Sequence, residues 1–169
     1  MRVNKVSIRV ASTADADAVS DLFARCYPVL MAGAYSTETL AAALPLMTNA
    51  NPALLSSGTY YVAERDDGTV VGCGGFTADQ PGTGQRKAAT GHVRHFATDP
   101  RCLRQGIGRG IIERAMMDAR DAGMRRLDCF SSLNAVPFYS ALGFTVLEPI
   151  LVPLTAQVLL PAAHMHREI

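Results

Sequence analysis

The sequence predicts a domain of the α/β (α+β) class, in which a mixed sheet carries helices on both faces. Three observations predict this class: strand-like segments recur between segments of helical spacing, a short acidic turn ending in glycine joins two apolar strands, and a long amphipathic helix closely follows another strand. A chain of 169 residues suits one domain with one sizeable core, so we expect a single domain over residues 1–169.

The first third of the chain predicts one strand and two helices. Residues 6–11 alternate apolar and polar side chains, as a half-buried strand does. Ser12 or Thr13 can cap the next helix, and Pro28 disturbs its apolar pattern. Ser36 can cap a second helix, which the Asn51-Pro52 pair ends.

The middle of the chain predicts a hairpin, a loop and another strand. Residues 59–65 and 69–76 are rich in strand-forming side chains, and the Asp66-Asp67-Gly68 segment between them is a typical hairpin turn. Residues 80–89 combine proline, glycine and polar side chains, which predicts a mobile surface loop. Residues 91–98 form the next strand.

The last part of the chain predicts the amphipathic helix and a return to the sheet. The helix covers residues 106–122 and ends at Gly123. The remaining predicted elements are a strand at 126–130, a helix at 135–142, and strands at 144–152 and 163–169. These segments bring the sheet to about seven strands.

Composition excludes several classes of protein. Lysine and arginine together number 16 against 15 acidic residues, so net charge favours neither nucleic acid nor a membrane surface as a partner. No apolar stretch approaches the ~18 residues of a spanning helix, and the N-terminus has no hydrophobic signal region, so we expect a cytoplasmic protein. The four cysteines form no Cys-x-x-Cys pair, which predicts buried free thiols and no metal.

The segment Arg104-Gln105-Gly106-Ile107-Gly108-Arg109 has the features of an anion site. Its glycines let backbone N–H groups converge, and the helix start adds unpaired donors and a partial positive charge. A Walker loop is excluded because no lysine follows Gly106 or Gly110. A dinucleotide fingerprint is disfavoured because Ile111 stands where its third glycine belongs.

Two segments together resemble the GCN5-related N-acetyltransferase (GNAT) family. The coenzyme-binding motif of that family is glutamine or arginine, any two residues, glycine, any residue, and glycine or alanine. It falls on residues 103–108, where Leu103 replaces the usual glutamine or arginine. A second family segment, Asn134 with Pro137-Phe138-Tyr139 and Leu142-Gly143-Phe144, follows at the right distance.

The resemblance implies an acetyl-CoA-dependent N-acetyltransferase, with acetyl-CoA as co-substrate and direct attack by a primary amine of a small molecule or peptide in a ternary complex. It also implies a mostly antiparallel sheet in which the fourth and fifth strands, residues 91–98 and 126–130, splay apart to admit the pantetheine arm. Dimers are common in the family, so a homodimer is one arrangement that the resemblance allows.

The cofactor-binding residues follow from the same resemblance. The backbone amides of Phe96 and Thr98 would pair with the pantetheine arm, and Asn134 would hydrogen-bond near it. The loop acts mainly through its amides, so Leu103 would weaken side-chain help without abolishing binding. The residues implied to bind the cofactor are Phe96, Ala97, Thr98, Leu103, Arg104, Gln105, Gly106, Ile107, Gly108, Arg109, Asn134 and Phe138.

Two residues are candidates for proton transfer. Tyr139 matches the family position of a general acid that donates to the leaving thiolate, although it can equally be an aromatic that packs beside Phe138. His92 lies fourteen residues before Gly106, where the family often carries a base; the alternative is a polar strand end with a water chain. On a regular strand the side chain of Arg94 lies on the same face as that of His92, and the side chain of His95 lies on the opposite face. A bulge between them would change which side chains share a face.

Other reactive side chains have simpler interpretations. His164 and His166 alternate on the last predicted strand, and without a third ligand we expect a solvent-facing pair rather than a metal site. Cys129 lies in an apolar strand, so we expect a buried thiol and not a nucleophile.

The acceptor is not identified by the sequence. In the family the first two helices and the hairpin around strands three and four shape the acceptor pocket, which makes Tyr27, Met31, Tyr35 and Phe76 the candidates, or equally core residues. Two other hypotheses remain: an acyl-CoA-binding sensor that has lost catalysis, and a nucleotide-binding protein of another kind.

Overall fold

The computed structural model describes residues 5–169. Seven strands form one sheet in the order β1-β2-β3-β4-β5-β7-β6. The strands are β1 (Val6–Val10), β2 (Tyr60–Arg65), β3 (Val70–Thr77), β4 (Thr90–Thr98), β5 (Arg126–Ser132), β6 (Thr145–Pro153) and β7 (Leu159–Glu168). The helices are α1 (Ala16–Leu30), α2 (Thr37–Met47), α3 (Pro52–Leu55), α4 (Ile107–Asp121) and α5 (Val136–Ala141).

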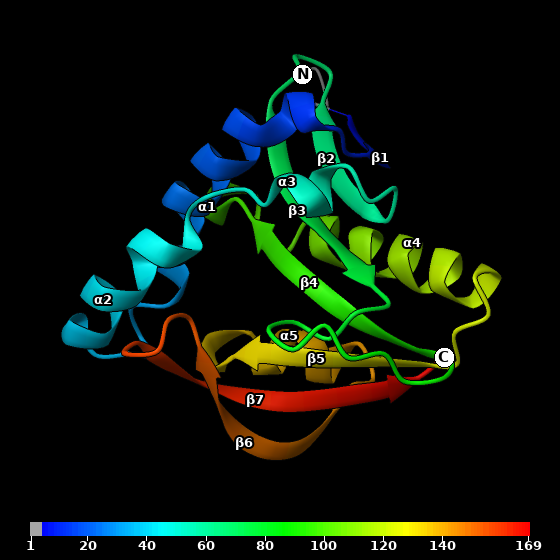
Figure 1. Cartoon of the computed structure of the whole chain (residues 1–169). Coiled ribbons are helices and arrows are strands. Elements are labelled where there is room, and N and C mark those ends of the chain that lie inside the picture. Colours follow the sequence, from blue (N-terminus) through cyan, green and yellow to red (C-terminus); the bar gives the residue numbers. More distant parts are fainter. Residues whose placement is uncertain (1–4) are drawn as a thin grey trace.

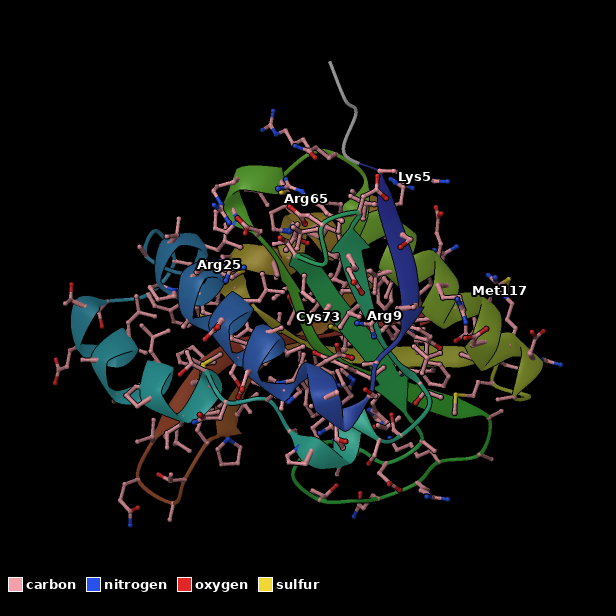
Figure 2. The ribbon with its side chains drawn as sticks, turned by 90° about the horizontal axis from the view of Figure 1, so that it is seen from above. Lys5, Arg9, Arg25, Arg65, Cys73 and Met117 are labelled. Atoms are coloured by element: carbon pink, nitrogen blue, oxygen red, sulfur yellow. The ribbon has the colours of Figure 1, made fainter. Side chains whose placement is uncertain are left out.

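The predicted fold class is confirmed. Neighbouring strands are antiparallel except β4 and β5, which run parallel. α1 lies on one face of the sheet and α4 on the other (Figure 1, and from above in Figure 2). No helix within residues 5–169 is long and apolar enough to cross a membrane.

Several element boundaries differ from the prediction. Pro28, which disturbs the apolar pattern, lies inside α1, because a proline in the last turn removes only one backbone hydrogen bond. The second predicted helix corresponds to α2, and the short α3, which the pattern did not predict, begins at Pro52. The last strand begins at Leu159, four residues earlier than predicted, because it pairs with β6 through Pro161, a residue that the pattern assigned to a connection.

Glycines in β3 allow α4 to pack closely on the sheet. A Cβ atom at Gly72 would stand 2.7 Å from Ile107 Cγ2 and 3.1 Å from Ile111 Cδ1, both of α4. The apolar face of α4 therefore sits directly on β3 and on β4, and this contact holds the start of α4 against the end of β4.

Separate apolar clusters form on the two faces of the sheet. The cluster under α4 and α5 includes Val93 and Cys129, while the cluster under α1 includes Cys73 and Ala97. A third, smaller cluster joins α2 to the start of β7 through Met31 and Leu160. All four cysteines are free and buried, as predicted.

A bulge interrupts β4 at His95. The β3–β4 register shifts by one residue between Cys73 and Gly75, and His95 adopts a φ of 47°, which non-glycine residues seldom occupy. The bulge changes the parity of the strand: the His95 ring lies 6.2 Å from the ring of Phe23 on α1, so it joins the α1 face.

Candidate functional site

The strands β4 and β5 separate after only three paired residues. Thr90, Gly91 and His92 pair with residues 126–128, and beyond them the two strands diverge. Figure 1 shows the resulting gap, which opens toward α1 and α2. The splayed fourth and fifth strands that the resemblance implied are therefore present, and they leave one edge of β4 without a neighbouring strand.

The free edge of β4 presents the amides of Phe96 and Thr98. Asp99 N–H donates to Val71 O at 2.9 Å and Ala97 pairs with Cys73, so the alternation of an antiparallel ladder turns Thr98 away from β3. The carbonyls on this edge accept from α1, Thr98 O from Cys26 Sγ at 3.2 Å and Phe96 O from the Tyr27 hydroxyl at 3.4 Å.

A second stretch of unpaired amides lies at the start of α4, beyond the hydrogen-bonded turn at Asp99. In the part of the chain that the structure describes, no hydrogen-bond acceptor pairs with any backbone amide from Leu103 to Arg109. Arg104 and Gly106 adopt positive φ values of 62° and 77°, and Gly106 caps α4 without a side-chain hydrogen bond. Successive free N–H groups at a helix start form a concave site for an anion.

Asp99 anchors the beginning of this loop. Its buried carboxylate accepts from the backbone N–H, Nε and Nη2 of Arg101 and from Nη2 of Arg25, a residue of α1 labelled in Figure 2. These bonds hold the pKa of Asp99 well below its usual range. Because two arginines balance its charge, this carboxylate does not oppose an anion at the helix start.

The side chains of the predicted loop residues differ in accessibility. Leu103 is 44% exposed and offers no polar group, while Gln105, Arg104 and Arg109 are exposed at the rim. Ile107 and Gly108 are buried. A Cβ atom at Gly108 would lie 2.9 Å from the ring of Phe138, so the glycine lets α5 approach the first turn of α4.

Tyr139 lies at the gap between β4 and β5. Its ring packs edge-on against Phe96 of β4 and Phe144, and only 5% of the residue is exposed. Burial raises the pKa of Tyr139 well above its ordinary value, with the nearby Cys129 thiol adding to the effect. The hydroxyl is therefore protonated at neutral pH.

Asn134 offers an unsatisfied acceptor beside Tyr139. Its Oδ1 atom is buried and has no hydrogen-bond partner among residues 5–169. A buried polar atom normally has a partner, so this oxygen fits a ligand that donates an N–H group there.

His92 is too buried to be in direct contact with solvent. Only 2% of it is exposed, and its Nε2 atom is buried without a partner within the described chain. Burial lowers the pKa of His92, while the Asp128 carboxylate opposes that shift and the charge of Arg94 adds to it. The imidazole is consequently neutral at pH 7 and able to accept a proton.

Sequence reasoning missed the contribution of His95. The bulge turns this side chain toward α1, where its ring lies near that of Phe23 while part of the residue stays exposed to solvent. Those surroundings lower the pKa of His95 to about 4, with Arg94 adding a smaller effect. No local pattern marks a bulge, although the two histidines around Arg94 could have suggested that both be kept as candidates.

The expectation that His164 and His166 face solvent is wrong. The His164 side chain is 19% exposed, its Nε2 lies 3.6 Å from Asp128 Oδ1, and His166 Nδ1 is buried. Both residues are half-buried, and the His164 ring packs edge-on against Phe130 of β5 with the ring centroids 5.1 Å apart. Within residues 5–169 no group of three or more metal-ligating side chains comes together.

Three of the four candidate acceptor residues come together. Met31 and Tyr35 are buried in one apolar cluster, and Tyr27 packs against it. The Tyr35 hydroxyl accepts from Leu133 N–H at 2.9 Å and donates to Pro161 O. Phe76 is buried under α4, on the opposite face of the sheet, so the structure separates it from the tyrosines.

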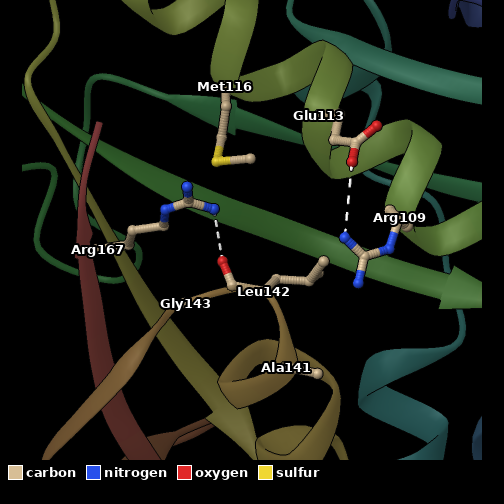
Figure 3. Close-up of a pocket in the computed structure, with 7 residues that line it drawn as sticks. All are labelled: Arg109, Glu113, Met116, Ala141, Leu142, Gly143 and Arg167. Carbon is tan, nitrogen blue, oxygen red and sulfur yellow. Dashed lines mark hydrogen bonds and ion pairs between the residues drawn. The ribbon is translucent and has the colours of Figure 1, made fainter.

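A groove of about 280 Å³ lies beside the gap, between α4 and the end of α5 (Figure 3). Arg109, Glu113 and Met116 line it from α4, and Arg167 of β7 closes the other side. Arg109 belongs to the first turn of α4, so the groove begins next to the unpaired amides, outside the gap itself.

Cysteine chemistry does not explain the site. Burial raises the pKa of Cys129 to about 12, which leaves its thiol protonated and unreactive at neutral pH. The other polar groups around the gap are the backbone donors, Tyr139 and the histidines of β4.

Comparison with known proteins agrees with this geometry. A family model described as "Acetyltransferase (GNAT) family" matches residues 16–144. The chain is 34% identical over 101 residues to an amino-acid acetyltransferase of Mycobacterium tuberculosis, a match that covers 59% of this chain and 52% of the relative, so the chain spans about half the length of that relative.

Solved structures share the fold over the whole chain. A GCN5-related N-acetyltransferase from Rhodopseudomonas palustris is similar with a TM-score of 0.79 and 20% identity, covering 100% of this chain and 99% of that one. The PaiA N-acetyltransferase from Thermoplasma acidophilum, solved with coenzyme A, has a TM-score of 0.72 and 17% identity, covering 98% and 99%.

Proposed function

Because the chain belongs to the acetyltransferase (GNAT) family, we propose that it is an acetyl-CoA-dependent N-acetyltransferase that acetylates a primary amine of a small molecule or peptide. The observation that carries the proposal is the pair of free-amide stretches on either side of the Asp99 turn, one on the edge of β4 and one from Leu103 to the first turn of α4. A ligand with both an amide-rich arm and phosphates matches these two stretches.

The residues present fit coenzyme A. The pantetheine arm has amides that pair with Phe96 and Thr98 as an added strand would, and the unpartnered Oδ1 of Asn134 accepts from an N–H of the same arm. The pyrophosphate suits the amides of residues 103–109, with Arg104 and Arg109 adding charge at the rim. Bound there, the cofactor supplies the acetyl thioester.

The amine has to lose a proton before or during attack. An alkyl amine has a pKa near ~10 and is mostly protonated at pH 7, so a base assists the reaction. We assign this role to the neutral His92. Because its ring is buried, the proton reaches it through a bridging water.

The leaving sulfur has to gain a proton. As the amine nitrogen bonds to the carbonyl carbon, the carbon–sulfur bond breaks and the thiolate leaves; the Tyr139 hydroxyl donates to that sulfur. The raised pKa of Tyr139 keeps the donor protonated throughout the working pH range. It also disfavours the tyrosinate form, so Tyr139 stabilises the leaving thiolate mainly by donating a hydrogen bond to its sulfur.

The role of Tyr139 is tested by Tyr139→Phe. The variant keeps the ring and its packing but removes the donor, so kcat should fall about 100-fold while acetyl-CoA affinity changes little. Release of free coenzyme A thiol measures turnover, and calorimetric titration measures affinity. Unchanged kcat under conditions in which thiol release limits the rate would remove Tyr139 from this role.

A second candidate function is a non-catalytic acyl-CoA sensor with the same fold. The exposed Leu103, which cannot replace the polar side chain usual at that motif position, is the observation that favours it. Mass spectrometry of amine mixtures incubated with acetyl-CoA separates the two functions, because an enzyme forms acetylated products and a sensor forms none.

A further inference from the structure

Arg94 carries a half-buried positive charge beside the gap. It lies on β4, one residue before the bulge, on the same face as His92. Its Nη1 donates to Thr77 Oγ1 at 3.1 Å, which uses one of the five N–H donors of a guanidinium. Burial lowers the pKa of Arg94, yet an arginine remains charged at neutral pH.

No carboxylate forms an ion pair with this charge within the described chain, residues 5–169. The Asp79 carboxylate is near enough to act on the charge of Arg94, but it is paired with Arg86. Asp128, which acts on the neighbouring His92, accepts from Arg126 at 2.7 and 2.8 Å. A partly desolvated guanidinium without a counter-ion is unfavourable, so the site suits a ligand that brings a negative charge.

The phosphates of coenzyme A are poorly placed to supply that charge. The free amides that suit them begin at Leu103, beyond the far end of β4. Arg94 and Thr98 are four residues apart, about 13 Å along a strand, and the loop lies farther still. Val93 lies in the cluster under α4, so the alternation of a strand turns the side chain of Arg94 to the opposite, α1 face of the sheet.

The remaining groups around Arg94 are neutral or positive. His92 and His95 flank it on β4, both with lowered pKa values, and Lys87 of the β3–β4 loop lies near His92. Across the gap, Phe130 packs against the rings of His92 and His164. An acceptor with a second ammonium group would find no uncommitted carboxylate there.

We propose that the amine acceptor carries a carboxylate group and that Arg94 binds it. The inference rests on the proposed acetyltransferase function and narrows the acceptor to an amino acid, or a peptide with a carboxylate near its amine. The planar guanidinium and a carboxylate form two parallel N–H···O bonds, which fixes the acceptor's orientation as well as its position. Arg94 is then a specificity-determining residue, while the proton steps stay with other groups.

Matched pairs of acceptors test the proposal. Each proteinogenic amino acid is compared with its carboxamide, which keeps the amine and the side chain but loses the negative charge. The wild-type protein should acetylate the acid of at least one pair with a kcat/KM ~10-fold or more above that of the amide. Glutamate with glutamine, and aspartate with asparagine, extend the comparison to side-chain carboxylates.

Variants of Arg94 complete the test. Arg94→Gln should lower kcat/KM for the acid about 10- to 100-fold and leave the amide within about 3-fold. Arg94→Lys keeps the positive charge but lacks the planar guanidinium, so its kcat/KM for the acid should lie between those of the wild type and Arg94→Gln. Arg120→Gln, an exposed site on the last turn of α4, is the control and should change neither value.

Acetyl-CoA affinity and the thermal midpoint confirm that each variant is folded. If Arg94→Gln does not fold, Arg94→Lys replaces it as the test variant. The inference is overturned if the wild type has the same kcat/KM for the acid and the amide, or if Arg94→Gln lowers kcat/KM equally for both. Either result leaves the acetyltransferase function intact. Failure to acetylate any amine, by a protein that binds acetyl-CoA, overturns the proposed function and this inference with it.

Discussion

At the scale of single residues, burial decides which side chains can exchange protons. His92 is buried and His95 is exposed at the bulge, yet both imidazoles are neutral at pH 7 because their surroundings lower their pKa values. His92 lies at the last residue pair before β4 and β5 diverge, so we assign the role of base to it, assisted by a water.

The pH dependence of turnover tests that assignment. The neutral imidazole is the active form, and the lowered pKa of His92 keeps it neutral down to a pH below the ordinary histidine value of ~6.5. The acid-side limb of kcat should therefore lie below ~6.5. His92→Gln should lower kcat about 100-fold and remove the limb.

His95→Gln is the companion variant. If it removes the acid limb while His92→Gln retains the limb, the base is His95 and the assignment to His92 is wrong. Thermal midpoints of both variants show whether the loss of activity reflects unfolding.

At the scale of elements, the start of α4 depends on glycine conformation. Gly106 adopts a φ of 77° in open space, so an alanine there meets no atom but occupies a strained backbone region. In that variant the backbone strain lies in the turn that orients the free N–H groups. The helix start and its ligand therefore depend on the backbone of this turn more than on its side chains.

Gly106→Ala should cost about 1 kcal/mol of unfolding free energy and weaken acetyl-CoA binding about 10-fold, as roughly one charge-assisted hydrogen bond is lost. Gly123→Ala is the matched control, because Gly123 also has a positive φ, 88°, and open surroundings at the other end of α4. Urea unfolding and calorimetric titration measure both. Equal affinities in the two variants would contradict a role for the Gly106 turn.

At the scale of the whole molecule, Tyr35 joins parts that are distant in sequence. It follows α1, and its hydroxyl bonds Leu133 N–H after β5 and Pro161 O within β7. The wall beside the gap therefore consists of three segments held by one side chain. Asn134 follows Leu133 directly, so the same bond also positions the proposed pantetheine contact.

Tyr35→Phe should lower the unfolding free energy by about 2 kcal/mol, because it removes two hydrogen bonds, one from Leu133 N–H and one to Pro161 O. It should also raise the KM of the acceptor. Tyr61→Phe is the control, since the Tyr61 hydroxyl bonds Asp118 on the α4 side, away from the gap. If both variants raise the acceptor KM equally, Tyr35 is not specific to the acceptor wall.

The elements and the loop could largely be predicted from the chain because their signals are local. The hairpin turn at Asp66-Asp67-Gly68, the long amphipathic helix and the glycines of residues 106–108 each act within a few residues, through backbone conformation or apolar spacing. Tyr139 belongs to a short motif in the same way.

The surroundings of the site could not be predicted because they depend on contacts between distant segments. The bulge at His95 arises from the pairing of β4 with β3, and it alone puts His95 on the α1 face. Phe76 and Tyr27 lie on opposite faces for the same kind of reason.

By itself, the sequence determined the fold class and the glycine turn at the start of α4, because backbone conformation and apolar spacing are properties of neighbouring residues. Only the tertiary structure decided that the acids near Arg94 are paired with other arginines, that His164 and His166 are half-buried, and that Tyr139 meets Phe96 through the gap. The physical reason is that burial and charge pairing result from the packing of whole strands and helices, which no short segment encodes.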